Sequence, residues 1–117
     1  MKFNNEIVLK NSTSIKSESI HDIMYFTSSN GITEVNLVEQ KSYIIESPLN
    51  KLETILPDDF FYRINRQTIV NLMFIKCIHY EGKKEVILVN NTKFKLSKRR
   101  ESRLIEQYYN ITNKILN

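Results

Sequence analysis

The chain has 117 residues, 41% of them apolar and 26% charged, a composition that predicts one globular domain over residues 1–117 and excludes a disordered chain. A single cysteine, Cys77, excludes an intramolecular disulfide framework and indicates a reducing compartment. Since no secretory signal and no apolar run of about 18 residues is present, we expect a cytoplasmic protein with no membrane partner.

Short apolar runs separated by turn residues predict a mostly β fold with short helices. Asn30-Gly31 is a strong hairpin signal, and further short turns are expected at Glu39-Gln40, residues 81–84 and residues 90–92. Because these turns leave no room for crossover connections, we expect antiparallel sheets, with residues 22–47 forming a three-stranded meander. The expected strands cover residues 6–10, 14–17, 22–28, 32–38, 41–47, 61–65, 73–80, 85–89 and 93–96.

A short helix is expected after the meander. Ser47 suits its N-cap and Pro48 its first helical position. Apolar residues then recur at intervals of three to four and predict a single buried face, formed by Leu49, Leu52, Ile55 and Leu56.

A second helix is expected at the carboxyl end, with Ser97 as its N-cap. This start places Lys98, Arg99 and Arg100 in the first turn, where cations oppose the helix dipole. An incoming phosphate would explain that placement, because it would meet free backbone N–H groups and three cationic side chains together. An exposed cluster screened by solvent explains the same residues.

The net charge of +4 is unevenly distributed along the chain. Residues 1–62 carry 5 basic and 9 acidic side chains, whereas residues 63–117 carry 12 basic and 4 acidic ones. The segment KFKLSKRRESR, residues 93–103, holds six basic residues against Glu101. Such a block favours a polyanionic partner, although a basic face that only keeps the protein in solution gives the same pattern.

No arrangement typical of an enzyme is present in the sequence. The chain lacks a glycine-rich phosphate loop, a G-x-S-x-G motif and an H-E-x-x-H motif. Cys77 and His79 fall on one face of an expected strand, but two ligands do not make a zinc site, and Cys77 is interpreted as a small core residue. We therefore expect no catalytic residue, no metal and no cofactor.

The segment FFYRINRQTIVNL, residues 60–72, places polar side chains within an apolar frame. Arginine, asparagine and glutamine can make paired hydrogen bonds to base edges, and they also bind phosphate oxygens. A polar turn whose side chains cap backbone groups would have the same composition. The chemistry of the residues leaves both interpretations open.

The motifs, in their order along the chain, resemble those of the LytTR DNA-binding domain family. The string FYRINRQTIVN, residues 61–71, is similar to the family signature F-x-R-[VI]-H-R-S-x-[LIV]-V-N. Residues 22–26 resemble its D-I-x-[YF]-[LIF] strand, residues 49–56 its S-L-x-x-L-E-x-x-L helix, and residues 96–100 its [LV]-S-R-x closing segment. The resemblance covers roughly residues 7–109.

The resemblance implies a bacterial transcription-regulation module that binds double-stranded promoter DNA, typically at direct repeats, as a homodimer or as tandem copies. It implies an elongated stack of small antiparallel sheets with a C-terminal helix, in which loops enter the grooves. Members are often output domains of two-component response regulators. No receiver domain precedes the module here, so the chain is expected to be an excised output domain or a stand-alone regulator, with a sensor kinase partner only if its parent has a receiver.

Three DNA-contacting regions of the family fall on this chain. They are the loop 28–33, with candidates Ser29, Asn30 and Thr33; the turn of Asn65, Arg66 and Gln67; and the segment Lys98, Arg99 and Arg100. Arg66 is the leading candidate, followed by Arg99. Asn65 and Gln67 stand where the family usually has His and Ser, so base preference need not follow that of other members.

The same resemblance separates supporting residues from candidate contacts. Arg63 is assigned a structural or phosphate-binding role, and Asn71 is assigned to capping of the backbone. The four core residues expected here are Phe61, Ile64, Ile69 and Val70.

Two other functions compete with DNA binding. An acidic protein partner could add a strand to an exposed sheet edge such as residues 41–47. RNA binding is disfavoured, because it needs exposed stacking aromatics and the aromatic residues here lie in apolar runs.

Overall fold

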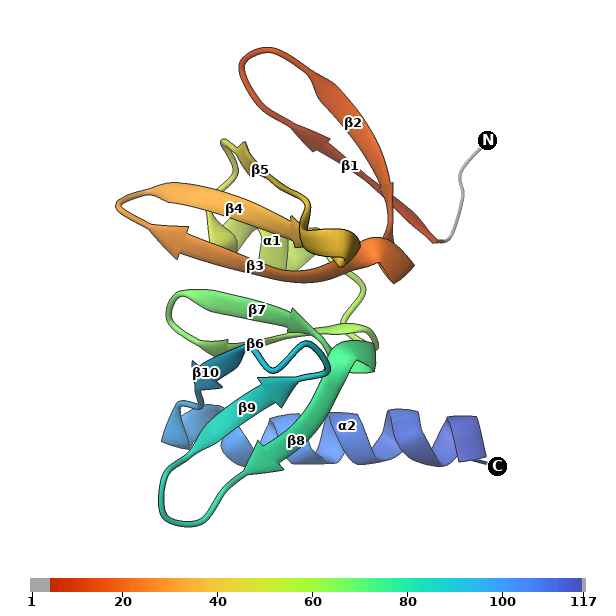
Figure 1. The fold of residues 1–117 in the computed structure, drawn as a ribbon, viewed down its shortest axis with the longest axis vertical. Coiled ribbons are helices and arrows are strands. Elements are labelled where there is room, and N and C mark those ends of the chain that lie inside the picture. Colours follow the sequence, from red (N-terminus) through yellow and green to blue (C-terminus); the bar gives the residue numbers. More distant parts are fainter. Residues whose placement is uncertain (1–4, 117) are drawn as a thin grey trace.

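The computed structural model describes the backbone of residues 5–116 and the side chains of residues 5–112. In this part of the chain, three antiparallel sheets follow one another along the longest axis of a molecule that measures 43 × 36 × 26 Å (Figure 1). The expected stack of small antiparallel sheets with a C-terminal helix is confirmed. Neither described α-helix combines the length and the apolar character needed to cross a membrane.

Strands joined by short turns are neighbours in each sheet, and the pairing of β3 with β7 brings two distant segments of the chain together in the central sheet. The first sheet pairs β1 (Glu6–Lys10) with β2 (Ile15–Ser19). The central sheet has the order β5-β4-β3-β7-β6, with β3 (Ile23–Ser29), β4 (Ile32–Leu37), β5 (Ser42–Ile45), β6 (Phe61–Asn65) and β7 (Thr68–Asn71). The third sheet has the order β10-β9-β8, with β8 (Ile75–His79), β9 (Glu85–Leu88) and β10 (Lys93–Lys95). The helices are α1 (Leu49–Ile55) and α2 (Glu101–Leu116).

The central sheet lies between two apolar cores. Neighbouring residues of a strand point to opposite faces, so Ile69 of β7 belongs to the core beneath α1 and the first hairpin, whereas Val70 belongs to the core beneath the third sheet and α2. On β6, Phe61 belongs to the same core as Ile69, and Ile64 belongs to the same core as Val70. The four expected core residues of this segment are thus buried, and they are shared between two cores.

Residues 68–71 form a strand that the sequence pattern does not predict. The sequence predicts Ile69 and Val70 as core residues and Asn71 as a cap, whereas residues 68–71 together make up β7, which pairs with β3 on one side and β6 on the other. All four residues are buried. A strand covered on both faces shows no alternation of apolar and polar residues, and this explains why the pattern is missing.

The start and the apolar face of α1 differ from the prediction. Pro48, and not Ser47, occupies the N-cap, and the helix begins at Leu49. Ile55 is 53% exposed because the helix ends there and the extended residue Leu56 fills the core position instead.

The interpretation of Cys77 as a core residue is wrong. Cys77 is half-buried on β8, an edge strand of the third sheet, and its Sγ lies 3.4 Å from Nε2 of the exposed His79. An edge strand lacks a neighbour on one side, so this part of β8 stays accessible.

Asn71 is a backbone cap, as expected. Its side-chain Oδ1 accepts a hydrogen bond from the N–H of Met73 at 3.0 Å, and its Nδ2 donates to the carbonyl oxygens of Ile20 and Ile23, each at 2.9 Å. The side chain is completely buried. Asn71 therefore ties the end of β7 to the segment that leads into β3.

Replacing Asn71 with alanine is expected to lower the free energy of unfolding by about 2–4 kcal/mol, because two buried carbonyl groups and one part-buried N–H lose their partner. Urea unfolding followed by circular dichroism measures the change. Asn90→Ala is the matched control, since it removes one exposed side-chain bond to the N–H of Thr92 and should cost less than about 1 kcal/mol. Equal losses in the two variants would contradict the role given to Asn71.

Candidate nucleic-acid interface

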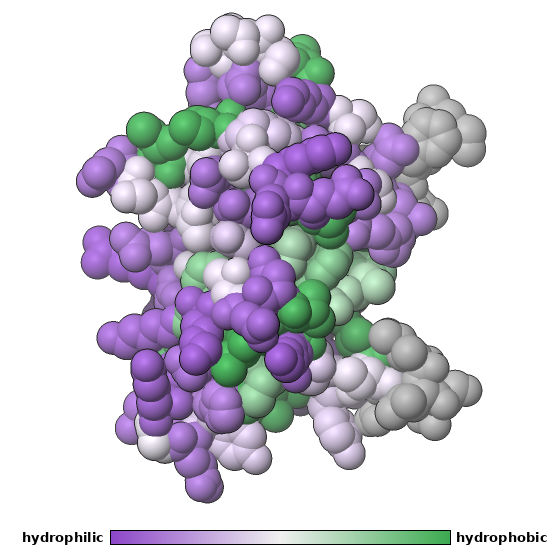
Figure 2. Space-filling model, viewed as in Figure 1, coloured by the Kyte–Doolittle hydropathy of each residue, from purple (hydrophilic) through white to green (hydrophobic). Residues whose placement is uncertain are grey.

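Three segments that are far apart in the sequence meet at one edge of the molecule, on the left in Figure 1: the β3–β4 turn, the β6–β7 turn and the chain that leaves β10. The N–H of Ser28 donates to the carbonyl oxygen of Gln67 at 2.9 Å and joins the first two. The N–H of Ser97 donates to the carbonyl oxygen of Ile64, also at 2.9 Å, and joins the chain that leaves β10 to β6, the strand that leads into the β6–β7 turn. Figure 2 shows hydrophilic side chains along most of this edge.

The β3–β4 turn presents Ser29 and Asn30 to solvent. Asn30 and Gly31 both have left-handed backbones, with φ of 53° and 78°, as a tight two-residue hairpin requires. Thr33, two residues further on, is only 1% exposed. The structure therefore offers Ser29 and Asn30 to a partner, but not the side chain of Thr33.

The β6–β7 turn is held from inside by Arg63. Its Nε donates to the carbonyl oxygen of Asn65 at 3.3 Å, and its Nη2 donates to the carbonyl oxygen of Arg66. The Arg63 side chain is 11% exposed, which agrees with a structural role. With the backbone fixed in this way, the side chains of Arg66 and Gln67 remain exposed.

The side-chain amide of Asn65 is engaged within the protein at both ends. Its Oδ1 accepts from the N–H of Gln67 at 2.8 Å, and its Nδ2 donates to the carbonyl oxygen of Lys95 at 2.7 Å. Asn65 thereby closes its own turn and fastens it to β10. Of the three candidates in this turn, Arg66 and Gln67 are the ones whose side chains face solvent.

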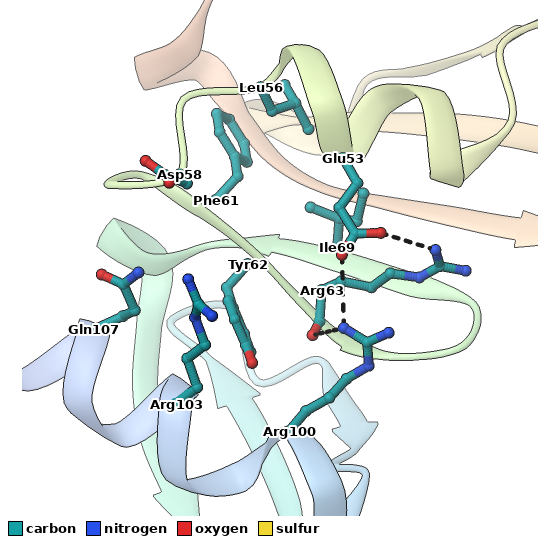
Figure 3. Close-up of a pocket in the computed structure, with 10 residues that line it drawn as sticks. All are labelled: Glu53, Leu56, Asp58, Phe61, Tyr62, Arg63, Ile69, Arg100, Arg103 and Gln107. Carbon is teal, nitrogen blue, oxygen red and sulfur yellow. Dashed lines mark hydrogen bonds and ion pairs between the residues drawn. The ribbon is translucent and has the colours of Figure 1, made fainter.

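Arg100 turns into the protein and meets Arg63 at the carboxylate of Glu53 (Figure 3). Oε1 of Glu53 lies 3.1 Å from Nη1 of Arg63, and Oε2 lies 3.6 Å from Nη1 of Arg100. Arg63 also donates to Oδ1 of Asn50 at 2.6 Å, and Arg100 donates to the carbonyl oxygen of Arg63 at 3.3 Å. These contacts leave Lys98 and Arg99 as the exposed members of their segment.

The expected capping by Ser97 is not observed. Lys98–Arg100 form a 3-10 turn before α2, and Ser97 precedes that turn without a side-chain capping bond. The α-helix itself begins with Glu101, an acidic residue that suits its first turn. The three cations consequently do not stand in the first turn of the α-helix.

A groove of about 990 Å³ separates the β6–β7 turn from β9 and β10. Its lining is strongly basic and consists of Asn65, Arg66, Gln67, Lys83, Lys84, Glu85, Lys93, Phe94, Lys95, Leu96, Ser97 and Lys98. A second hollow of about 600 Å³ is lined by Asn50, Glu53, Arg63, Arg66, Ser97, Arg99 and Arg100. Arg66 and Ser97 line both, so the two depressions adjoin at these residues.

The sequence model of the LytTr DNA-binding domain family matches residues 4–108, most of the chain. The chain belongs to the LytTR family. Four chains of solved structures also match. One is the LytTr DNA-binding domain of a protein from Bacillus cereus described as a methyl-accepting/DNA response regulator; it is 23% identical, covers 90% of this chain and 97% of its own, and has a TM-score of 0.75, which shows the shared fold. No match was found among curated proteins.

Four lysines that line the groove of this LytTR domain were not among the predicted contacts: Lys83, Lys84, Lys93 and Lys95. Lys93 and Lys95 of β10 are exposed, while Phe94 between them packs against Tyr25 with ring centroids 4.8 Å apart. The Lys-Phe-Lys alternation within the basic block was the signal that would have placed both lysines on one face. Lys84 is less available, because its Nζ lies 2.7 Å from the carboxylate of Glu101.

A further hollow of the LytTR domain, of about 290 Å³, lies between α1, β6 and α2, with Tyr62 beside Arg100 and Arg103 (Figure 3). Burial raises the pKa of the Tyr62 phenol, and the nearby arginines, which lower it, do not cancel that effect. The phenol is therefore neutral at physiological pH. Among the described residues, no group of three or more His, Cys, Asp or Glu side chains is placed to hold a metal ion.

Replacing Arg63 with lysine is expected to lower the free energy of unfolding by about 1–2 kcal/mol. An ammonium group keeps the charge but cannot bond to two turn carbonyls, Asn50 and Glu53 at once, as the planar guanidinium does. Thermal or urea unfolding measures the loss. The matched control is Arg99→Lys, an exposed arginine that should change stability by less than about 0.5 kcal/mol. If Arg63→Lys were as neutral as this control, the bracing of the turn by Arg63 would be wrong.

Proposed function

We propose that this LytTR domain binds double-stranded promoter DNA sequence-specifically through the edge where its three turns meet. The observation that carries the proposal is the exposure of Arg66 and Gln67 on a turn whose backbone is fixed by Arg63 and Asn65. Membership of a DNA-binding domain family supports DNA binding and a role in transcription regulation. The turn would enter the major groove, and no recognition helix would be needed.

Each exposed side chain of the turn has a chemistry that suits base edges. A guanidinium such as that of Arg66 can donate two parallel hydrogen bonds to O6 and N7 of guanine. An amide such as that of Gln67 can pair with N6 and N7 of adenine. Asn65 contributes by holding the turn to β10, because both ends of its amide are already bonded.

The surrounding cations would hold the DNA backbone. Lys98 and Arg99 are exposed on one side of the turn, and Lys93 and Lys95 are exposed across the groove. Ser29 and Asn30, at the tip of the β3–β4 turn, would add contacts at the flank. Such phosphate and sugar contacts fix the register of a protein on the duplex and make its affinity depend on salt.

The wider role that we propose is that of a non-enzymatic output module of a two-component regulator, acting in the cytoplasm. The Bacillus cereus relative is described as part of a response regulator, and its domain shares this fold. Members of the family typically bind direct repeats, so two copies on neighbouring sites are the arrangement expected on a promoter.

Strand addition at β5 by an acidic partner is not proposed. The first hairpin already reaches this edge, since the N–H of Glu46 donates to the carbonyl oxygen of Lys10 at 3.3 Å and Nδ2 of Asn11 donates to that of Ile44 at 3.0 Å. Nζ of Lys16 also lies 4.1 Å from the centre of the Tyr43 ring. A partner strand would have to displace these contacts.

Replacing Arg66 with alanine is expected to weaken binding to a selected duplex by about 1–3 kcal/mol and to narrow the preference over random DNA, because a base contact is lost. Fluorescence anisotropy with a duplex selected from a random pool measures both quantities. The matched control is Arg103→Ala, which removes the same charge from α2, outside the two depressions that Arg66 lines. This variant should retain the preference for the selected duplex over random DNA. A folded Arg66→Ala protein with unchanged specificity would refute the role of the turn.

Replacing Lys98 with alanine should weaken binding to all duplexes similarly and reduce the slope of log K against log salt by roughly one, because one phosphate contact is lost. Titrations at several salt concentrations measure this slope. Lys10→Ala, in the first hairpin, serves as the charge-matched control and should leave the slope unchanged. The same slope for Lys98→Ala and the unsubstituted protein would remove Lys98 from the phosphate contacts.

A further inference from the structure

We propose that Glu53 is a positioning residue for DNA recognition, acting on the β6–β7 turn through Arg63. The inference rests on the proposed function, because it assigns a residue that prepares the same surface. Glu53 belongs to α1, which is not one of the segments predicted to contact DNA.

One carboxylate joins three elements at this point (Figure 3). Oε1 of Glu53 lies 3.1 Å from Nη1 of Arg63 on β6, and Oε2 lies 3.6 Å from Nη1 of Arg100 in the 3-10 turn. Each of its oxygens therefore faces a different arginine. The helix, the strand that leads into the β6–β7 turn and the start of the basic segment are thereby connected through a single side chain.

The two arginines need this carboxylate because both lie against it with little of their side chains exposed. Their side chains are 11% and 17% exposed, and Nη1 of Arg100 lies 3.3 Å from the carbonyl oxygen of Arg63. Two like charges in such a place repel each other more strongly than they do in bulk water. Glu53 offsets that repulsion, and its loss would favour rotation of one guanidinium toward solvent.

A rotation of Arg63 would release the turn that carries Arg66. The other N–H groups of the same guanidinium donate to the carbonyl oxygens of Asn65 and Arg66. Because the guanidinium is planar and rigid, the contact with Glu53 on one side helps to set its orientation toward the turn on the other side. Glu53 thus restricts the conformations from which Arg66 approaches DNA.

The sign of the effect on affinity separates this role from simple electrostatics. Glu53 lines the same hollow as Arg66 and Arg99. A carboxylate beside a surface that meets phosphates repels DNA, so its removal should by itself strengthen binding. A positioning role predicts the opposite, because DNA would then have to order a turn that is no longer held in advance.

The test is to measure the affinity of the full chain carrying Glu53→Gln for a duplex selected from a random pool and for random duplex DNA. We expect specific binding to weaken roughly 3- to 10-fold, the cost of ordering one or two side chains on association, with a smaller change for random DNA. The control Glu46→Gln removes an exposed carboxylate from the loop before α1 and should leave affinity unchanged or slightly stronger. Unchanged or tighter specific binding by Glu53→Gln would overturn the proposal.

Glu53→Asp provides a second variant that keeps the charge. Its shorter side chain cannot contact both arginines as Glu53 does, so positioning predicts weaker specific binding, whereas net charge alone predicts no change. Thermal unfolding of each variant verifies that the proteins are folded at the temperature of the titration. Wild-type specific affinity in a folded Glu53→Asp protein would count against the proposal.

A double variant tests whether Glu53 acts through the turn. In an Arg66→Ala background, Glu53→Gln should weaken specific binding by less than about 2-fold, because residues that act together are not additive. The full 3- to 10-fold effect in that background would show a general structural effect and would overturn the proposal.

Two outcomes separate the failure of this proposal from the failure of the proposed function. If the unsubstituted chain preferred no selected duplex over random DNA, the proposed function itself would fail. If the unsubstituted chain showed the preference but Glu53→Gln behaved like Glu46→Gln, only the role of Glu53 would fail.

Discussion

The burial of β7 on both faces is the constraint on which the rest of the molecule depends. This strand lies between β3 and β6, separates the two cores and has no exposed residue. Its end is fixed by Asn71, whose amide bonds to the segment leading into β3. Because β7 cannot shift without disturbing both cores, the turn that precedes it is delivered to the edge of the sheet at a defined position. The candidate interface therefore inherits its geometry from the most buried strand of the fold.

The polar side chains around the turn divide into those that hold it and those that it presents. Arg63, Asn65 and Glu53 form bonds within the protein, whereas Arg66 and Gln67 are exposed. This division matters energetically, because a loop ordered before association loses less conformational entropy when it binds. Side chains with base-reading chemistry thus occur in both groups, and only their hydrogen bonds distinguish a support from a candidate contact.

Most of the strands could be predicted from the sequence, because short apolar runs between turn residues such as Asn30-Gly31 report local structure. The strand β7 could not, since a strand buried on both faces lacks the alternating pattern. The family signature located the three candidate segments, but it could not show that Thr33 is buried or that Arg100 points inward. Those outcomes depend on contacts between residues far apart in the chain, such as Arg100 with Glu53, which neither periodicity nor spacing encodes. The burial of Ile69 and Val70 in two different cores likewise required the tertiary structure.

The hydrogen bond between the N–H of Ser28 and the carbonyl oxygen of Gln67 makes the β3–β4 and β6–β7 turns parts of one rigid sheet. The spacing between the two turns is therefore set by the pairing of β3 with β7. On DNA, one inserted base pair rotates everything beyond it by roughly 35° about the helix axis. If both turns contact DNA as proposed, the protein would tolerate a changed base between them more readily than a changed spacing. The spacing of the contacted bases along the duplex, as well as their identity, would then be part of what this fold recognises.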